Sequence, residues 1–413
     1  MEQDSIHQYT ASEPEIPDVP SVVEFVSTTS FWEAARPWLS RRGIELYEIP
    51  PHADPEYLWR TWWTPSVSTP APLPFARCMV DAPNEQKVYD PLIKLACGQD
   101  SLGRDVMLKL VDKNSPEYSI FQCLMQHQDL FTDPSAFPCV LPPLAILDTP
   151  HQYSIVTMPT WGSPFYIEEF RSMREILPFM RCLLQGLVFL HANRIAHRDI
   201  LDWNIVVNCY KLDRDPKRLS EDLVDHRRRS DVLYALMDYD QSIYLPQVTS
   251  LEHCRRPAQE AWAGADMYRP DDVCVGEPTY NPFAYDVAML GNLFRVNFSR
   301  AVPLMPTLPA LFDKMTTHIV SQRFTAVEAL KFLNDSAMDV PQDALEASLE
   351  LAVECGTMFD SEVYWSRLPP GLQASWTDYR APPLPRSFWI LNWLIQIPIF
   401  RRVIVPGRRF LGI

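Results

Sequence analysis

One stretch of this 413-residue chain constrains its fold more than any other. Apolar side chains recur at helical spacing over 173–192, which predicts an amphipathic helix. A polar loop with the tripeptide His197-Arg198-Asp199 follows at once, and an apolar run over 204–209 then predicts a short strand. This loop between a helix and a strand is the most informative part of the chain for function.

Further elements are predicted on both sides of the loop. The apolar run 106–111 predicts a buried strand with a single lysine, Lys109, and a second strand is predicted over 153–158. Pro116 is well placed to begin a helix. Apolar spacing predicts further helices over 24–43, 284–299, 308–319 and 325–334.

The loop resembles the catalytic loop of the protein kinases, because His-Arg-Asp is followed by four residues and then Asn204. Downstream, an apolar run ends in Asp238 and resembles the D-F-G element, with Tyr239 in place of the phenylalanine. Asp286 opens a stretch similar to the kinase helix that anchors the catalytic loop. Arg323 lies in a segment similar to the kinase segment that ends R-P-T-A-x-E-A-L. These elements stand in the kinase order along the chain.

The resemblance implies a site for ATP and Mg²⁺. Its catalytic residues are Asp199, Lys109 and Asn204, and Asp199 is the base that accepts the proton of the substrate hydroxyl. Lys109 binds the α- and β-phosphates, with Glu117 as its ion-pair partner. Asn204 and Asp238 are the implied magnesium ligands.

Three more residues are expected at the nucleotide. Gly98 and Gly103 are the only glycines of the segment 95–103, where the resemblance implies a glycine-rich phosphate loop. Met158 ends the second predicted strand and is expected to line the site. Because this loop is poor in glycine, backbone amides approach the phosphates less closely, and Asp100 adds negative charge there.

Two other positions depart from the kinase pattern. Leu201 stands where Ser/Thr kinases have a lysine that neutralises the transferred phosphate, and Asp240 replaces the glycine of D-F-G. These losses weaken transition-state charge stabilisation, the main term in phosphoryl transfer. Two functions therefore stay open: an ATP-dependent kinase that acts on a protein Ser/Thr hydroxyl, and a pseudokinase that acts as an interaction module. A small-molecule phosphotransferase is disfavoured by Arg198, Asp286 and Arg323.

Two arginines have expected partners. Arg198 precedes the catalytic aspartate, and such an arginine often meets a phosphate on the activation segment, here expected on Thr or Ser at 249–250. For Arg323 the resemblance implies a carboxylate partner, with Asp271 as the best match and Glu277 as the second.

The expected fold is α+β, a bilobal protein-kinase-like fold over 88–336. A small β-rich N-lobe (88–158) with a five-stranded sheet and one helix precedes a mainly helical C-lobe (159–336), which carries a charged insertion at 211–230. A disordered acidic lead-in, an N-terminal extension and a C-terminal extension are expected over 1–23, 24–87 and 337–413.

Three features sharpen the resemblance. They are the helix with Phe31-Trp32 and Pro37-Trp38, the insertion at 211–230, and the sequence Tyr-Asn-Pro-Phe at 280–283. Together they are similar to a family of kinase-domain proteins from mushroom-forming fungi. The functions of that family are largely unassigned, so this likeness adds no mechanism.

Charge and cysteine usage bear on partners and location. The formal net charge is −15, which disfavours nucleic acid as a partner because binding to it needs a positive surface. The nine cysteines form no C-x-x-C pair, and residues 1–20 contain no apolar signal-peptide core. We therefore expect reduced thiols and a cytoplasmic location.

The C-terminal residues 387–413 differ from the rest of the chain. Residues 387–400 are strongly apolar but too few to span a bilayer, which needs about 20. Four arginines follow, at 401, 402, 408 and 409. A basic, aromatic tail of this kind either lies at a membrane surface or docks as a helix on the protein's own core, and the sequence leaves both open.

Overall fold

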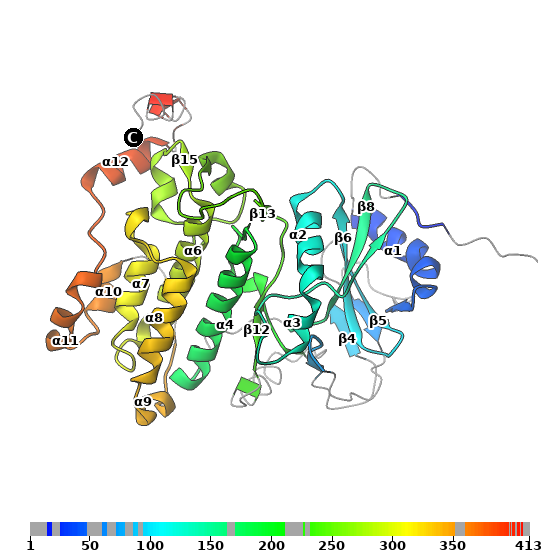
Figure 1. Cartoon of the computed structure of the whole chain (residues 1–413), viewed down its shortest axis with the longest axis horizontal. Coiled ribbons are helices and arrows are strands. Elements are labelled where there is room, and N and C mark those ends of the chain that lie inside the picture. The colour runs from blue at the N-terminus through cyan, green and yellow to red at the C-terminus, as the bar shows by residue number, and fades with distance from the viewer. Residues whose placement is uncertain are drawn as a thin grey trace, which may run out of the picture.

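The chain is a mixed α+β protein, with a sheet in its N-terminal part and mostly helices in its C-terminal part (Figure 1). The computed structural model describes residues 15–18, 25–47, 60–63, 72–78, 86–89, 94–162, 170–210, 226–227, 232–351, 360–395, 397, 399–400, 403–404 and 406–407. The predicted lead-in 1–23 and the insertion 211–230 lie mostly outside these ranges. The arrangement is compatible with the bilobal organisation that the sequence predicts.

The N-terminal part is built on an antiparallel five-stranded sheet in the order β1-β5-β6-β8-β7. The strands are β1 (Ile44–Leu46), β5 (Leu95–Asp100), β6 (Asp105–Asp112), β7 (Ala145–Asp148) and β8 (Tyr153–Pro159). The strands predicted over 106–111 and 153–158 are confirmed as β6 and β8. Strand β1 lies within the range predicted as an extension, so that range contributes an edge of the sheet.

Helices cover the two faces of this sheet differently. Helix α1 (Phe25–Ser40) packs on one face and α2 (Pro116–Leu124) lies on the other, toward the helical half (Figure 1). Because side chains alternate along a strand, Leu108 and Leu110 pack with α1, while Lys109 and Val111 point toward α2. The pleat of β6 thus fixes the direction of its single lysine.

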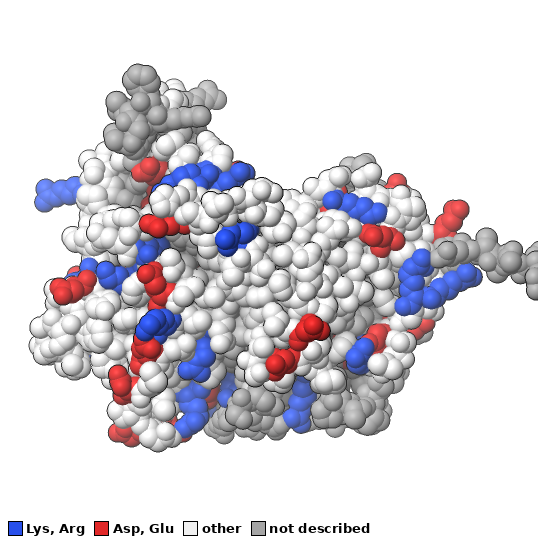
Figure 2. Space-filling view, in the orientation of Figure 1, with Lys and Arg blue, Asp and Glu red and all other residues white. Residues whose placement is uncertain are grey.

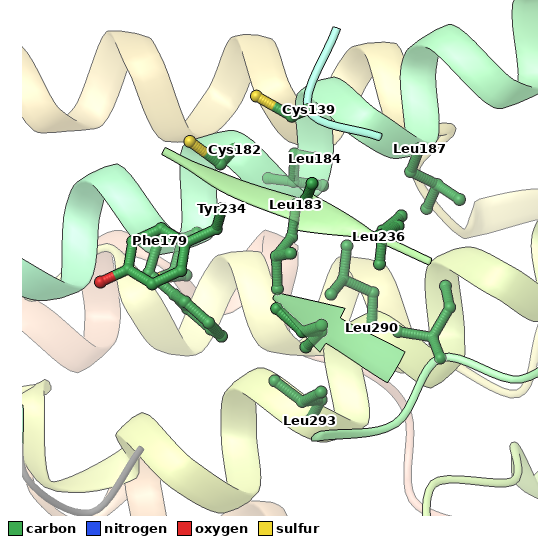
Figure 3. Packing of buried hydrophobic residues seen from close by; sticks show 14 of the residues in the cluster. Cys139, Phe179, Cys182, Leu183, Leu184, Leu187, Tyr234, Leu236, Leu290 and Leu293 are labelled. Carbon is green, nitrogen blue, oxygen red and sulfur yellow. The ribbon is translucent and has the colours of Figure 1, made fainter. Parts of the chain in front are cut away.

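The C-terminal part is organised around two long helices, α4 (Met173–Ala192) and α6 (Pro282–Phe298). Helix α4 has the predicted bounds, and α7 (Leu308–Thr316) and α8 (Ala326–Met338) occupy two more of the predicted helical ranges. Leu183 and Leu187 of α4, Leu290 of α6 and the strand residue Leu236 belong to one buried cluster (Figure 3). Among the described residues, α4 alone is long and apolar enough to cross a membrane, but 67% of its most apolar window is buried inside the protein.

Short strands link the two parts and shape the loops between the helices. They are β2 (Arg60–Trp63), β3 (Arg77–Cys78), β4 (Gln86–Tyr89), β9 (Ile195–Ala196), β10 (Ile205–Val207), β11 (Cys209–Tyr210), β12 (Tyr234–Leu236), β13 (Ile243–Tyr244), β14 (Arg256–Pro257) and β15 (Thr279–Tyr280). The β10–β12 pair is antiparallel and places Ile205 opposite Leu236. The two apolar runs predicted on either side of the insertion therefore form one hairpin.

The C-terminal extension wraps around the helical part through α9 (Gln342–Glu346), α10 (Ser361–Trp365), α11 (Pro370–Ser375) and α12 (Arg386–Ile395). Its anchor is Asp313 of α7, which is 1% exposed. That carboxylate accepts hydrogen bonds from the Tyr364 hydroxyl, from Nε1 of Trp365 at 2.9 Å and from the backbone N–H of Ala381 at 2.7 Å. Burial raises the pKa of Asp313, and the three donors oppose this effect.

We predict that Asp313→Ala lowers the free energy of unfolding by about 2–4 kcal/mol, because buried donors lose their acceptor. Urea denaturation measures the change. The control is Asp335→Ala on α8, whose partner Lys331 is 74% exposed and whose loss costs about 0.5 kcal/mol or less. If both substitutions lowered the free energy of unfolding equally, the assignment of Asp313 as the anchor would be contradicted.

Candidate functional site

The loop after α4 is held by one buried carboxylate. Asp286 of α6 is fully buried and accepts hydrogen bonds from the backbone N–H groups of His197 and Arg198, each at 2.7 Å. Nε2 of His191 lies 3.1 Å from the same carboxylate. Arg198 has φ of +65°, a conformation that costs about 1–2 kcal/mol for a residue other than glycine. The bonds to Asp286 offset that strain and fix the loop.

Asp199 has both carboxylate oxygens oriented by neighbours. Nδ2 of the buried Asn204 donates to the backbone oxygen and to Oδ2 of Asp199, each at 2.8 Å. The backbone N–H of Ala265 donates to Oδ1 at 3.2 Å. Asp199 itself stays partly exposed, so the carboxylate is oriented and still accessible.

Lys109 is the buried centre of a charge cluster that opens to solvent at Asp238 and Asp240. Its Nζ lies 2.5 Å from Oε1 of Glu117, 2.7 Å from Oδ1 of Asp238 and 3.3 Å from Oδ1 of Asp240. The pair of Lys109 with Glu117, expected from the sequence, is formed. The bond to Asp238 joins segments 129 residues apart and connects the sheet to the helical part.

Burial and the neighbouring charges shift the pKa values of the residues in this cluster. Burial disfavours the charged form of Lys109, but Glu117, Asp238 and Asp240 outweigh it and raise the pKa of the ammonium. Burial raises the pKa of Glu117 to about 8, helped by a hydrogen bond to Asp240 and opposed by Lys109. For Asp240, burial alone would raise the pKa, yet the bond from Glu117 and the Lys109 ammonium lower it. Burial and Asp240 thus favour the protonated form of Glu117, whereas Glu117 and Lys109 favour the charged form of Asp240.

Asp238 and Asn204 lie close together because their strands pair. The backbone N–H of Met237 donates to the carbonyl of Asn204 at 2.9 Å, and Asp238 follows with φ of +67°. Next to it, Tyr239 is buried, with ring centroids 5.5 Å from Phe121 of α2 and 5.8 Å from His197. The tyrosine thus packs α2, the loop and Asp238 into one unit.

The donor atoms fit a hard divalent cation. Oxygens of Glu117, Asp238 and Asp240 lie within 4.8 Å of one another. The amide nitrogen of Asn204 is directed at Asp199, so its amide oxygen is the atom left to bind a metal. Carboxylate and amide oxygens are the ligands that Mg²⁺ prefers, and these residues could hold it.

The three other residues expected at a nucleotide lie in the strands of the main sheet or in the turn between two of them. A Cβ on Gly98 would lie 2.7 Å from the carbonyl oxygen of Glu45, so its missing side chain makes room for β1. Gly103 has φ of +72° in the turn between β5 and β6. Met158 is buried in β8 opposite Met107. Their role in nucleotide binding remains a prediction that these contacts do not support.

The two arginines with expected partners have these contacts. Arg198 donates to the Glu260 carboxylate at 3.4 Å and to the hydroxyl of Tyr280 at 3.2 Å, and its phosphate partner at 249–250 stays a prediction. Arg323 pairs with Asp272 at 2.5 Å, one residue beyond the predicted Asp271. The sequence held no signal for the role of Glu260, because its distance along the chain from Arg198 follows no motif.

No protein-family model matches this sequence, and no curated protein matches it either. The resemblance to protein kinases and to the fungal kinase-domain proteins accordingly stays a prediction. The interpretation of this site rests on its residues and their geometry.

We predict that stability falls as pH rises from about 6 to about 8, by up to about 2 kcal/mol from Glu117 alone. The pKa of Glu117 is about 8 in the folded state against an ordinary 4.5, so the folded chain holds a proton that the unfolded chain releases. Denaturant unfolding across this range measures the slope, and Glu117→Gln should remove that part of it. The same slope in the variant would exclude Glu117 as its source.

Proposed function

We propose that this chain has a protein-kinase-like fold and is an ATP- and Mg²⁺-dependent protein kinase, which transfers the γ-phosphoryl group of ATP to a protein Ser/Thr hydroxyl. The observation that carries the proposal is the pair of contacts that Nζ of Lys109 donates to Glu117 and to Asp238. Kinases need the lysine–glutamate contact and the metal-binding aspartate in place before transfer. It is supported by Asp199, whose carboxylate Asn204 orients on the loop anchored to Asp286.

Each residue then has a defined task. Asp199 would accept the proton of the substrate hydroxyl through a carboxylate whose direction Asn204 and Ala265 already fix. Lys109 would bind the α- and β-phosphates, and Glu117 keeps its ammonium directed into the site. Asp238 and Asn204 would hold Mg²⁺, which when bound neutralises charge on the phosphates.

A pseudokinase that binds nucleotide is the second candidate, and two observations favour it. Leu201, in place of the lysine that neutralises the transferred phosphate, is fully buried in the core. The chain between β1 and β5, residues 47–94, contains no glycine, so no glycine amides there can approach a phosphate closely. The first feature weakens transfer, since no lysine neutralises the transferred phosphate, and the second weakens contact with the phosphates.

The test separates binding from transfer. With Mg·ATP at about ten times its Kd, we expect the midpoint of thermal unfolding to rise by about 1–3 °C. The shift should vanish with EDTA and in Asp238→Asn, while the exposed control Asp335→Asn keeps it. No shift in the native chain would contradict a Mg·ATP site. Transfer of labelled phosphate that Asp199→Asn abolishes supports the kinase, and a shift without transfer supports the pseudokinase.

Asp240 gives a sharper prediction at the same site. Its carboxylate contacts Lys109 and would lie beside the phosphates, so Asp240→Gly should tighten Mg·ATP binding by about five- to tenfold. Asp240→Asn, which removes only the charge, should give most of this gain. Calorimetric titration measures both. Weaker binding in either variant would show that Asp240 is a metal ligand rather than a competitor for Lys109.

A further inference from the structure

Helix α12 is apolar on two sides, and only one side is covered. Phe388 and Ile395 are buried against the helical part, where α12 contacts the turn Asp271–Val275. A Cβ on Gly276 would lie 2.6 Å from Cδ1 of Ile395, which shows how closely the helix docks there. Docking on the protein's own core, one of the two alternatives for the tail, therefore accounts for one side of α12.

The other side of α12 is open to solvent. Trp389, Ile390 and Trp393 are 62%, 60% and 62% exposed. Three more large apolar side chains are exposed after the helix, namely Ile399, Phe400 and Val403. Six of the thirteen large hydrophobic residues exposed in the described part of the chain thus lie within fifteen positions, 389–403. Single exposed apolar residues are ordinary, whereas a continuous run marks a surface that binds something.

Charge indicates what this surface binds. Residues 386–413 contain five arginines and no acidic residue, whereas the whole chain has a net charge of −15, so the remainder carries −20. On the face shown in Figure 2, basic and acidic side chains of the described residues are interspersed and form no extended basic area. The tail is therefore the one strongly basic, acid-free segment of an acidic chain.

Helix length and side-chain type favour a lipid surface. Ten residues of helix span about 15 Å, half of the bilayer's hydrocarbon core, so α12 can lie in the interface but cannot cross it. Tryptophan is enriched at that depth because its ring is apolar and its N–H is polar. A symmetric dimer through this face would instead bring two sets of five arginines together.

We propose that α12 and the residues after it bind the surface of an anionic phospholipid membrane. Trp389, Ile390 and Trp393 enter the interface, and the net positive charge of the sequence 386–413 attracts this end of the chain to anionic headgroups. Phe388 and Ile395 keep the helix on the protein, so the whole chain is held at the surface with its acidic remainder directed away. This inference is independent of the proposed kinase activity.

Co-sedimentation of the full chain with vesicles tests the proposal. The chain should bind phosphatidylcholine vesicles that contain phosphatidylserine, and bind pure phosphatidylcholine about tenfold more weakly or less. Trp389→Ser with Trp393→Ser should weaken binding about tenfold or more, and Arg401→Gln with Arg402→Gln should remove most of the preference for phosphatidylserine. Met338→Ser is the matched control, since Met338 is 78% exposed on α8, and it should leave binding unchanged.

Three results would overturn the proposal. The first is that the chain binds neither kind of vesicle. The second is that the tryptophan variant binds vesicles as tightly as the native chain and has the same thermal midpoint. The third is a dimer that forms without lipid in sedimentation velocity and depends on the two tryptophans. The last result would assign the surface to a second copy of the chain. Trp389, Trp393 and Met338 are exposed side chains, and circular dichroism should show the native helix content in every variant.

Discussion

The buried carboxylate of Asp286 is the constraint on which the rest of the site depends. It lies on α6, at the centre of the helical core, and accepts hydrogen bonds from the backbone N–H groups of His197 and Arg198. Arg198 holds a positive φ only because these bonds compensate for the strain. Asp199 and Asn204 follow directly, so the position of the candidate base is set by core packing rather than by the loop's own preferences.

The charge cluster on Lys109 joins the two parts of the molecule. Alternation along β6 turns Lys109 toward α2, and the β10–β12 hairpin brings Asp238 to it from the other side. Three carboxylates surround one buried ammonium and leave an excess of negative charge, while burial first and Asp240 second raise the pKa of Glu117. A divalent cation would relieve that excess, and the same geometry therefore favours a metal–nucleotide ligand.

The sequence predicted those parts of the site that follow from strong local patterns. The single lysine of β6, the helix start at Pro116 and the bounds of α4 are all consequences of periodicity and turn chemistry. It did not predict β1, because a strand of three residues separated from its partner by residues 47–94 leaves no periodic signal. The contacts of Asp240 and Glu260 were missed for a similar reason, since tertiary packing alone sets them.

The most direct measurement is a crystal structure of the chain soaked with Mn²⁺ and a non-hydrolysable ATP analogue, with the metal located by anomalous scattering. We expect Mn²⁺ between a carboxylate oxygen of Asp238 and the amide oxygen of Asn204, with Lys109 on the phosphates. An empty site at saturating nucleotide, or Mn²⁺ bound elsewhere without the analogue, would contradict the claim that this cluster is a nucleotide site.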